Sequence, residues 1–187
     1  CYMAGNSLGG FITWNYAAAH PEQVKKIILI DAAGYPFKRP PMMAALAGNK
    51  LITWLAPKLS SRFIVNASMR QVYGDPSKIT DSVAERYYEL SMRAGNRASF
   101  MAFINHFREV DTNAIKTIKA PTLIMWGEKD RWIPLVDAEK FHRDIAGSQV
   151  ITYPGVGHIP MEEDANQTVA DALHFFDTVN DSTLAVQ

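Results

Sequence analysis

The sequence lacks the features that mark several protein classes. Its 187 residues include one cysteine, Cys1, which excludes an intrachain disulfide framework. The 19 basic and 19 acidic residues balance to a formal net charge of zero, so no surplus of positive charge favours nucleic acid or an anionic membrane surface as a partner. No apolar run is long enough to cross a membrane. The 48% of hydrophobic residues is typical of a globular domain with one sizeable core.

Motifs for common cofactors are also missing. The chain has neither the Gly-x-Gly-x-x-Gly pattern of dinucleotide-binding folds nor a Walker phosphate loop. A single terminal cysteine makes a zinc site improbable on chemical grounds, and the spacing of metal ligands is absent from four of the histidines, which are His20, His106, His142 and His174. We therefore expect no cofactor and no metal.

A nucleophile-elbow pattern lies close to the beginning of the chain. Gly5-Asn6-Ser7-Leu8-Gly9 follows a short strand pattern at 1–4 and precedes an apolar helical pattern at 11–19. Such a strand–turn–helix exposes the serine hydroxyl on a strained turn, and glycines at 5 and 9 would remove side chains that clash. The Leu8 N–H at the helix start would be an oxyanion donor. The alternative is that Ser7 merely caps the helix.

Alternating strand and helix patterns predict an α/β fold with a doubly wound, mostly parallel sheet. The runs at 26–31 and 120–127 are typical of strands buried on both faces, and a shorter strand pattern covers 149–153. Further helical patterns cover 135–145 and 162–179. Strands and helices in this order favour right-handed parallel βαβ units.

The alternation is interrupted between residues 36 and 111. Prolines precede four helical patterns with no strand pattern among them, at 42–55, 61–72, 81–94 and 97–109. We interpret 36–111 as a helical cap inserted into a core made by 1–35 and 112–187. The methionine and aromatic side chains of this segment would mainly pack its helices, and a few would line a pocket facing Ser7.

Two loops follow the carboxyl ends of predicted strands, where open α/β sheets bind ligands. One carries Asp130, and the other carries His158 after Gly155 and Gly157, which would give the loop freedom to reach Ser7. The chain order serine, aspartate, histidine suits a catalytic triad. His158 would take the Ser7 proton as general base, and Asp130 would orient the imidazole and stabilise its charged form.

Each triad candidate has a plainer interpretation. Asp130 could be an ordinary turn residue, and His158 could cap the last helix. Asp31 also follows a strand, which makes it a rival for the role of orienting acid. The three motifs in this order are far more specific than any one of them, so we predict that Ser7, Asp130 and His158 act together.

These residues resemble the α/β-hydrolase superfamily, in particular serine hydrolases with a helical cap such as carboxylesterases and lipases. The resemblance covers essentially the whole chain, through Gly5–Gly10, His20–Asp31, Pro121–Asp130 and Gly155–Glu162. The superfamily has eight mostly parallel strands with the cap after the sixth, and only the last four are recognisable here. The resemblance therefore implies that the first half of the fold, with the second oxyanion donor, comes from the same longer chain or from a second chain.

The resemblance also implies a reaction. Ser7 argues against haloalkane dehalogenases and epoxide hydrolases, which carry aspartate at the elbow. We expect cleavage of a carboxylic ester of a small or medium apolar substrate through an acyl-enzyme intermediate.

Two alternatives to ester cleavage remain open. The first is a carbon–carbon bond hydrolase for aromatic ring-cleavage products. Its cap resembles Val72–Thr80, and it would bind the substrate carboxylate through Arg86, which could equally be a solvated helix arginine. Those enzymes usually have tryptophan where this chain has Ile159. The second alternative is a ligand-binding member of the fold without catalysis.

Overall fold

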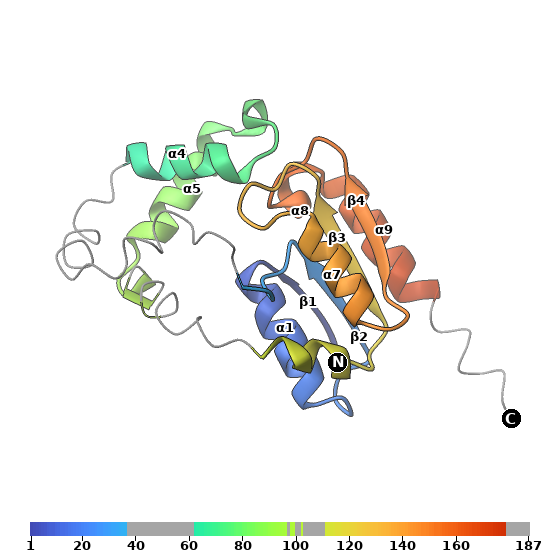
Figure 1. The fold of residues 1–187 in the computed structure, drawn as a ribbon. Helices are drawn as coiled ribbons and strands as arrows, with labels where there is room; N and C mark the ends of the chain where they lie inside the picture. Colours follow the sequence, from blue (N-terminus) through green and yellow to red (C-terminus); the bar gives the residue numbers. More distant parts are fainter. Residues whose placement is uncertain (37–61, 97, 100–101, 103–110, 179–187) are drawn as a thin grey trace, which may run out of the picture.

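A four-stranded parallel sheet with helices on both faces forms the centre of the molecule (Figure 1). The computed structural model describes residues 1–36, 62–96, 98–99, 102 and 111–178. The strands lie in the order β1-β2-β3-β4, and all three neighbouring pairs are parallel. Their bounds are β1 (Tyr2–Asn6), β2 (Lys26–Ile30), β3 (Thr122–Gly127) and β4 (Gln149–Tyr153). The predicted α/β class with a parallel sheet is thereby confirmed.

The two middle strands are buried on both faces, as their continuous apolar sequences predict. On one face, Ile124 and Trp126 of β3 share a core with Trp14 of α1 (Leu8–Ala19) and Phe141 of α7 (Val136–Asp144). The 3-10 helix η3 (Thr112–Thr117) adds to this same core. Alternate residues of the strands therefore serve two separate helix layers.

The opposite face of the sheet is covered by α9 (Ala165–Thr178). Phe175 of α9 packs in one cluster with Ile28 of β2 and with Leu123 and Met125 of β3. None of the helices in the described part of the chain combines the length and the apolar character that crossing a bilayer requires.

The helical segment predicted at 36–111 is described in part. Two of its predicted helices are present, as α4 (Arg62–Val72) and α5 (Asp81–Met92), with the 3-10 helix η2 (Pro76–Lys78) between them. The predicted helix at 42–55 and most of the one at 97–109 lie outside the described residues. In Figure 1, α4 and α5 lie beyond one end of the sheet, near α8 (Pro160–Glu163). The division into core and cap, with its pocket, stays a prediction.

The last predicted helix, at 162–179, is instead two helices. The chain leaves α8 at Asp164, whose φ of −139° and ψ of 60° are not helical, and α9 begins at the next residue. The break allows α8 and α9 to present their side chains in different directions. Glu163 of α8 turns its carboxylate towards the end of the sheet, whereas the apolar side chains of α9 must face the strands.

A buried lysine fastens α9 to the sheet. Lys26 of β2 is 3% exposed, and its Nζ donates to the backbone oxygens of Phe175 at 3.3 Å and Phe176 at 2.5 Å. The ammonium also lies over the rings of Tyr2 and Phe175. A cation at this position complements the negative C-terminal end of the helix dipole and satisfies carbonyl groups of the last turn.

We expect Lys26→Met to lower the free energy of unfolding by about 1 to 3 kcal/mol, because the carbonyl groups lose their donor while the apolar stem is kept. Urea unfolding monitored by circular dichroism measures the difference. The exposed neighbour Lys25 offers a matched control, and Lys25→Met should change stability by less than about 0.5 kcal/mol. Equal stability of the two variants would show that the ammonium contributes nothing.

Candidate active site

Ser7 lies on a strained turn between β1 and α1. Its φ of 53° and ψ of −113° are unusual for a residue other than glycine. Backbone hydrogen bonds hold this turn against the end of β2: Ser7 N–H donates to Ile30 O at 3.0 Å, and Ser7 O accepts from Ala33 N–H at 3.0 Å. The Ser7 side chain makes no hydrogen bond that caps α1. The geometry therefore favours the elbow interpretation over a simple helix cap.

The close approach of strand and helix at this turn requires glycine at 5 and 10. A Cβ on Gly5 would lie 2.2 Å from the backbone of Gly9, and a Cβ on Gly10 would lie 2.4 Å from Cβ of Ala32. A Cβ on Gly9 would meet no atom of the described residues within 4 Å. The predicted clash at position 5 is confirmed, but the described residues show none at position 9, because α1 presents only its backbone there to Gly5.

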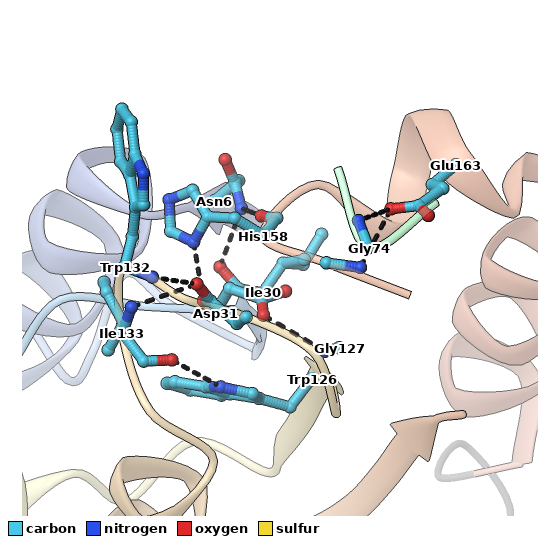
Figure 2. Close-up of polar contacts among 12 residues, drawn as sticks. Asn6, Ile30, Asp31, Gly74, Trp126, Gly127, Trp132, Ile133, His158 and Glu163 are labelled. Carbon is cyan, nitrogen blue, oxygen red and sulfur yellow. Dashed lines mark hydrogen bonds and ion pairs between the residues drawn. The ribbon is translucent and has the colours of Figure 1, made fainter. Parts of the chain in front are cut away.

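His158 and Asp130 are in direct contact at the carboxyl edge of the sheet. His158 Nδ1 lies 2.7 Å from Asp130 Oδ2, and the two side chains are 4% and 0% exposed. Figure 2 shows the imidazole above the loop that carries Trp132 and Ile133. The backbone N–H groups of these two residues donate to Asp130 Oδ1 at 2.7 and 3.0 Å. The carboxylate is thus held by three donors.

This pairing determines which imidazole nitrogen can act as a base. Because an ionised carboxylate only accepts hydrogen bonds, Nδ1 of His158 must carry a proton, which leaves Nε2 as the acceptor of the neutral ring. Nε2 is buried and has no hydrogen-bond partner among the described residues, Ser7 included. Catalytic hydrogen bonds are often long before substrate binds. Of the predicted set, the structure therefore joins His158 to Asp130 and leaves Nε2 available.

The histidine loop is fixed at its backbone by neighbours that the sequence did not reveal. Asn6 Nδ2 donates to His158 O at 2.9 Å and to Ile30 O at 3.2 Å, which ties the loop to the strand before Ser7. His158 N–H donates to Val72 O at 2.8 Å, at the end of α4. Trp132 also lies against the imidazole, with ring centroids 5.4 Å apart. The only sequence signal for these roles is the nearness of Asn6 and Trp132 to predicted site residues.

Gly157 allows this close packing. A Cβ at Gly157 would lie 2.2 Å from Val72 O and 2.4 Å from Gly74 N, so any side chain there would push the loop away from the end of α4. Gly155 has a φ of 81°, which suits glycine. The sequence predicts that both glycines give the loop freedom. Gly155 does allow a left-handed turn, whereas Gly157 lets the loop be held tightly.

Glu163 connects the histidine loop with the segment that follows α4. Its buried carboxylate accepts three backbone N–H groups, from Gly74 at 3.0 Å, Asp75 at 2.7 Å and Gly157 at 2.8 Å. Lys78 Nζ donates to the backbone oxygen of the same residue at 3.0 Å. The sequence does not indicate this role, because a pair of glutamates at a helix start is ordinarily explained by the helix dipole.

Arg86 is paired within the chain. Its guanidinium, with a side chain 53% exposed, donates to Glu162 at 2.7 Å, and the same carboxylate accepts the hydroxyl groups of Tyr87 at 3.0 Å and Tyr73 at 3.3 Å. Burial, followed by the charge of Glu162, raises the pKa of Tyr73 to about 12. The predicted roles of Arg86 as a substrate ligand and of the Leu8 N–H as an oxyanion donor stay predictions.

Asp31, the rival acid, does not take the place of Asp130. Its Oδ1 accepts the N–H of Gly127 at 3.0 Å, and no hydrogen bond joins it to His158 in the described part of the chain. Single oxygen or nitrogen atoms of Asp31, Asp130 and His158 lie within 4.8 Å of one another, as metal ligands can. However, Nδ1 and Oδ2 are already in contact, and backbone N–H groups point at both carboxylates, which suits hydrogen bonding better than a cation.

The chain is similar in sequence to known hydrolases. The profile of the family described as serine aminopeptidase, S33 (Hydrolase_4) matches residues 1–165. The chain is 29% identical to Lipase 3 of Moraxella sp. (strain TA144), a match that covers 94% of this chain and 56% of the lipase. It is 30% identical to a 2-hydroxymuconate semialdehyde hydrolase of Pseudomonas putida, a match that covers 92% of this chain and 64% of that enzyme.

Two solved structures show the same fold. A serine hydrolase of the bacterium Cycloclasticus zankles superimposes with a TM-score of 0.78 at 25% identity, over 96% of this chain and 65% of that protein. A meta-cleavage product hydrolase of Pseudomonas fluorescens IP01 gives a TM-score of 0.79 at 24% identity, over 96% of this chain and 65% of that enzyme. The chain thus spans between about half and two thirds of the length of these relatives.

The contacts of Glu163 lead to a test of stability. We expect Glu163→Gln to lower the free energy of unfolding by about 2 to 3 kcal/mol, because the amide nitrogen would face backbone N–H groups that need an acceptor. Denaturant titration gives the midpoint and the slope. The matched control is Glu162→Gln, which keeps an acceptor for its more exposed partners and should cost less than about 1 kcal/mol. Equal losses in both variants would contradict the assigned role.

Proposed function

Because the chain belongs to the serine aminopeptidase, S33, family of α/β-hydrolases, we propose that it acts as a serine hydrolase on the carboxylic ester of a small or medium apolar substrate. Ser7 is the nucleophile, His158 the general base and Asp130 the group that orients the imidazole. The observation that carries this proposal is the buried contact of 2.7 Å between Asp130 and His158, which leaves Nε2 free to accept a proton.

The reaction follows from the properties of these groups. Substrate binding brings the Ser7 hydroxyl to Nε2, which takes its proton as Oγ attacks the ester carbonyl carbon. Asp130 stabilises the imidazolium that forms, and the Leu8 N–H at the start of α1 donates to the developing oxyanion. His158 then returns the proton to the leaving alcohol. Water activated by the same imidazole hydrolyses the acyl-enzyme and restores Ser7.

Ester chemistry is favoured over carbon–carbon bond cleavage by two details of the described residues. Ile159 packs with Met69, Val72 and Tyr73 in an apolar cluster, where the second class usually has tryptophan. Arg86, which would bind the carboxylate of a ring-cleavage product, is already paired with Glu162. The similarity to a 2-hydroxymuconate semialdehyde hydrolase supports carbon–carbon bond cleavage as the second candidate. A binding protein without catalysis is the third candidate.

We also propose that the sheet is completed at β1. Among the described strands β1 has a neighbour on one side only, and Tyr2 on this strand is exposed. An unpaired edge of this kind is a template for another strand. The other half of the fold, from the same longer chain or from a second chain, would pair there and supply the second oxyanion donor. No nucleic acid and no membrane span belong to this proposal.

In the complete protein, Ser7→Ala and His158→Ala should each lower kcat for a short-chain aryl ester by about 10⁴- to 10⁶-fold, and the double variant should lose little more. The two residues act as one unit, so removing either leaves no proton transfer for the other to assist. Asp130→Asn should cost less, because the imidazole remains but is misoriented.

A surface serine provides the control for these activity measurements. Ser82→Ala changes an exposed residue and should keep normal turnover. Circular dichroism of each variant separates lost chemistry from lost folding. Near-normal turnover by folded Ser7→Ala protein would exclude serine catalysis and move the binding alternative ahead.

Arg86→Ala distinguishes the two catalytic candidates. If the protein is an esterase, this variant should turn over the aryl ester within about threefold of the native rate, since an exposed ion pair contributes little. If it cleaves ring-cleavage products, KM for such a dienoate should rise at least tenfold, because the substrate carboxylate loses its cation. Assaying both substrates with the native protein and with Arg86→Ala decides between them.

A further inference from the structure

A second acid lies behind the Asp130–His158 pair, at the carboxyl end of β2. Asp31 is 0% exposed, and its φ of 41° is unusual for a residue other than glycine. Its N–H donates to Met125 O at 3.0 Å, and its Oδ1 accepts the N–H of Gly127 at 3.0 Å. Both partners belong to β3, the strand that leads into the Asp130 loop. The backbone and one carboxyl oxygen of Asp31 are thus fixed.

The other carboxyl oxygen of Asp31 has no donor among the described residues. No N–H or O–H group within the described ranges reaches Oδ2, although this atom is buried. Asp130 and His158 are ionisable neighbours of Asp31, since an atom of each of the three side chains lies within 4.8 Å of the others. Asp130, like an ionised Asp31, can only accept hydrogen bonds. A proton on one of the two carboxyl groups is required before they can bond to each other.

The surrounding donors decide which of the two acids keeps the proton. Asp130 accepts two backbone N–H groups and the imidazole Nδ1, whereas Asp31 accepts one backbone N–H group. Hydrogen bonds to the charged form stabilise that form, so the negative charge belongs on Asp130.

The electrostatic environment acts in the same direction. Burial, followed by the charge of Asp130, raises the pKa of Asp31 well above its usual range, and the charge of Glu163 adds to this. The N–H of Gly127 opposes the shift but does not reverse it. Two adjacent carboxyl groups that share one proton are the ordinary result of such surroundings.

We propose that Asp31 is a positioning residue: a neutral carboxylic acid whose Oδ2–H donates to Asp130 and holds that carboxylate against Nδ1 of His158. The proton also keeps the buried cluster at one negative charge. A second negative charge beside the imidazole would favour the protonated ring, which cannot accept the Ser7 proton. The effect on rate rests on the proposed function, whereas the protonation of Asp31 does not.

The proton can be observed without measuring activity. Infrared spectroscopy of the folded native protein at pH 7 should show the carbonyl stretch of a buried neutral carboxylic acid, separate from the carboxylate bands. Asp31→Asn should abolish this band. Asp144→Asn is the matched control and should leave it unchanged, because hydrogen bonds from the Arg143 guanidinium lower the pKa of Asp144. Absence of the band from the native protein would overturn the proposal.

The positioning role is tested by two substitutions in the complete enzyme. Asparagine can still accept from Gly127 and donate to Asp130, so Asp31→Asn should keep kcat within about threefold and leave the pH–rate profile in place. Asp31→Leu has no donor and should lower kcat roughly tenfold to a hundredfold with little change in KM.

Two outcomes would count against the positioning role. If Asp31→Asn moves the rising limb of the pH–rate profile to lower pH, the native residue carried a charge, and the proposal is wrong. It is equally wrong if folded Asp31→Leu keeps native kcat. Should the leucine variant not fold, the infrared band and the asparagine profile still decide. If the proposed serine mechanism is wrong, folded Ser7→Ala protein will keep its turnover, and the infrared result will be unaffected.

Discussion

The hydrogen bond between Asp130 and His158 depends on a buried carboxylate that keeps its charge. Burial alone would favour its neutral form, so the charge must be stabilised by donors. The turn after β3 supplies two backbone N–H groups, and the imidazole supplies the third donor. The parallel sheet makes this possible, because the carboxyl ends of β1, β3 and β4 lie at one edge and present their loops to one another.

The position of His158 is set mainly through its backbone. Asn6 holds its carbonyl from the side of β1, and Val72 holds its N–H from the end of α4. Glu163 then fastens Gly157 to the chain that leaves α4. Hydrogen bonds thus join the end of α4 and the residues that follow it to the histidine loop, so a change at the end of α4 would act on the backbone of His158.

The two faces of the sheet are covered by different helices. The face covered by α1 and α7 contains Trp14, Trp126 and Phe141, which belong to one large apolar core. The other face is covered by α9, which Lys26 holds by its last turn. Rigid packing on both faces limits the movement of the strand ends, and catalytic groups on such elements keep their relative positions.

The sequence by itself was sufficient for the strands, the elbow and the order of the three motifs. The runs in β2 and β3 and the helices α1, α4, α5 and α7 follow from periodicity and turn residues, which act over a few neighbouring positions. The end of α8 at Asp164 and the close packing at Gly157 did not follow from the sequence. Each depends on contacts with residues far away in the chain, between Glu163 and Gly74 and between Gly157 and Val72.

Only the tertiary structure decided which carboxylate meets His158. Asp31 and Asp130 both follow strands, and nothing local distinguishes them. In space, the turn after β3 directs Asp130 to the imidazole, whereas β2 directs Asp31 to Gly127. The same holds for Arg86 with Glu162 and for Glu163 with Gly74. Such pairs join residues far apart in the chain, and the packing of helices and loops around the sheet, not residue type, brings them together.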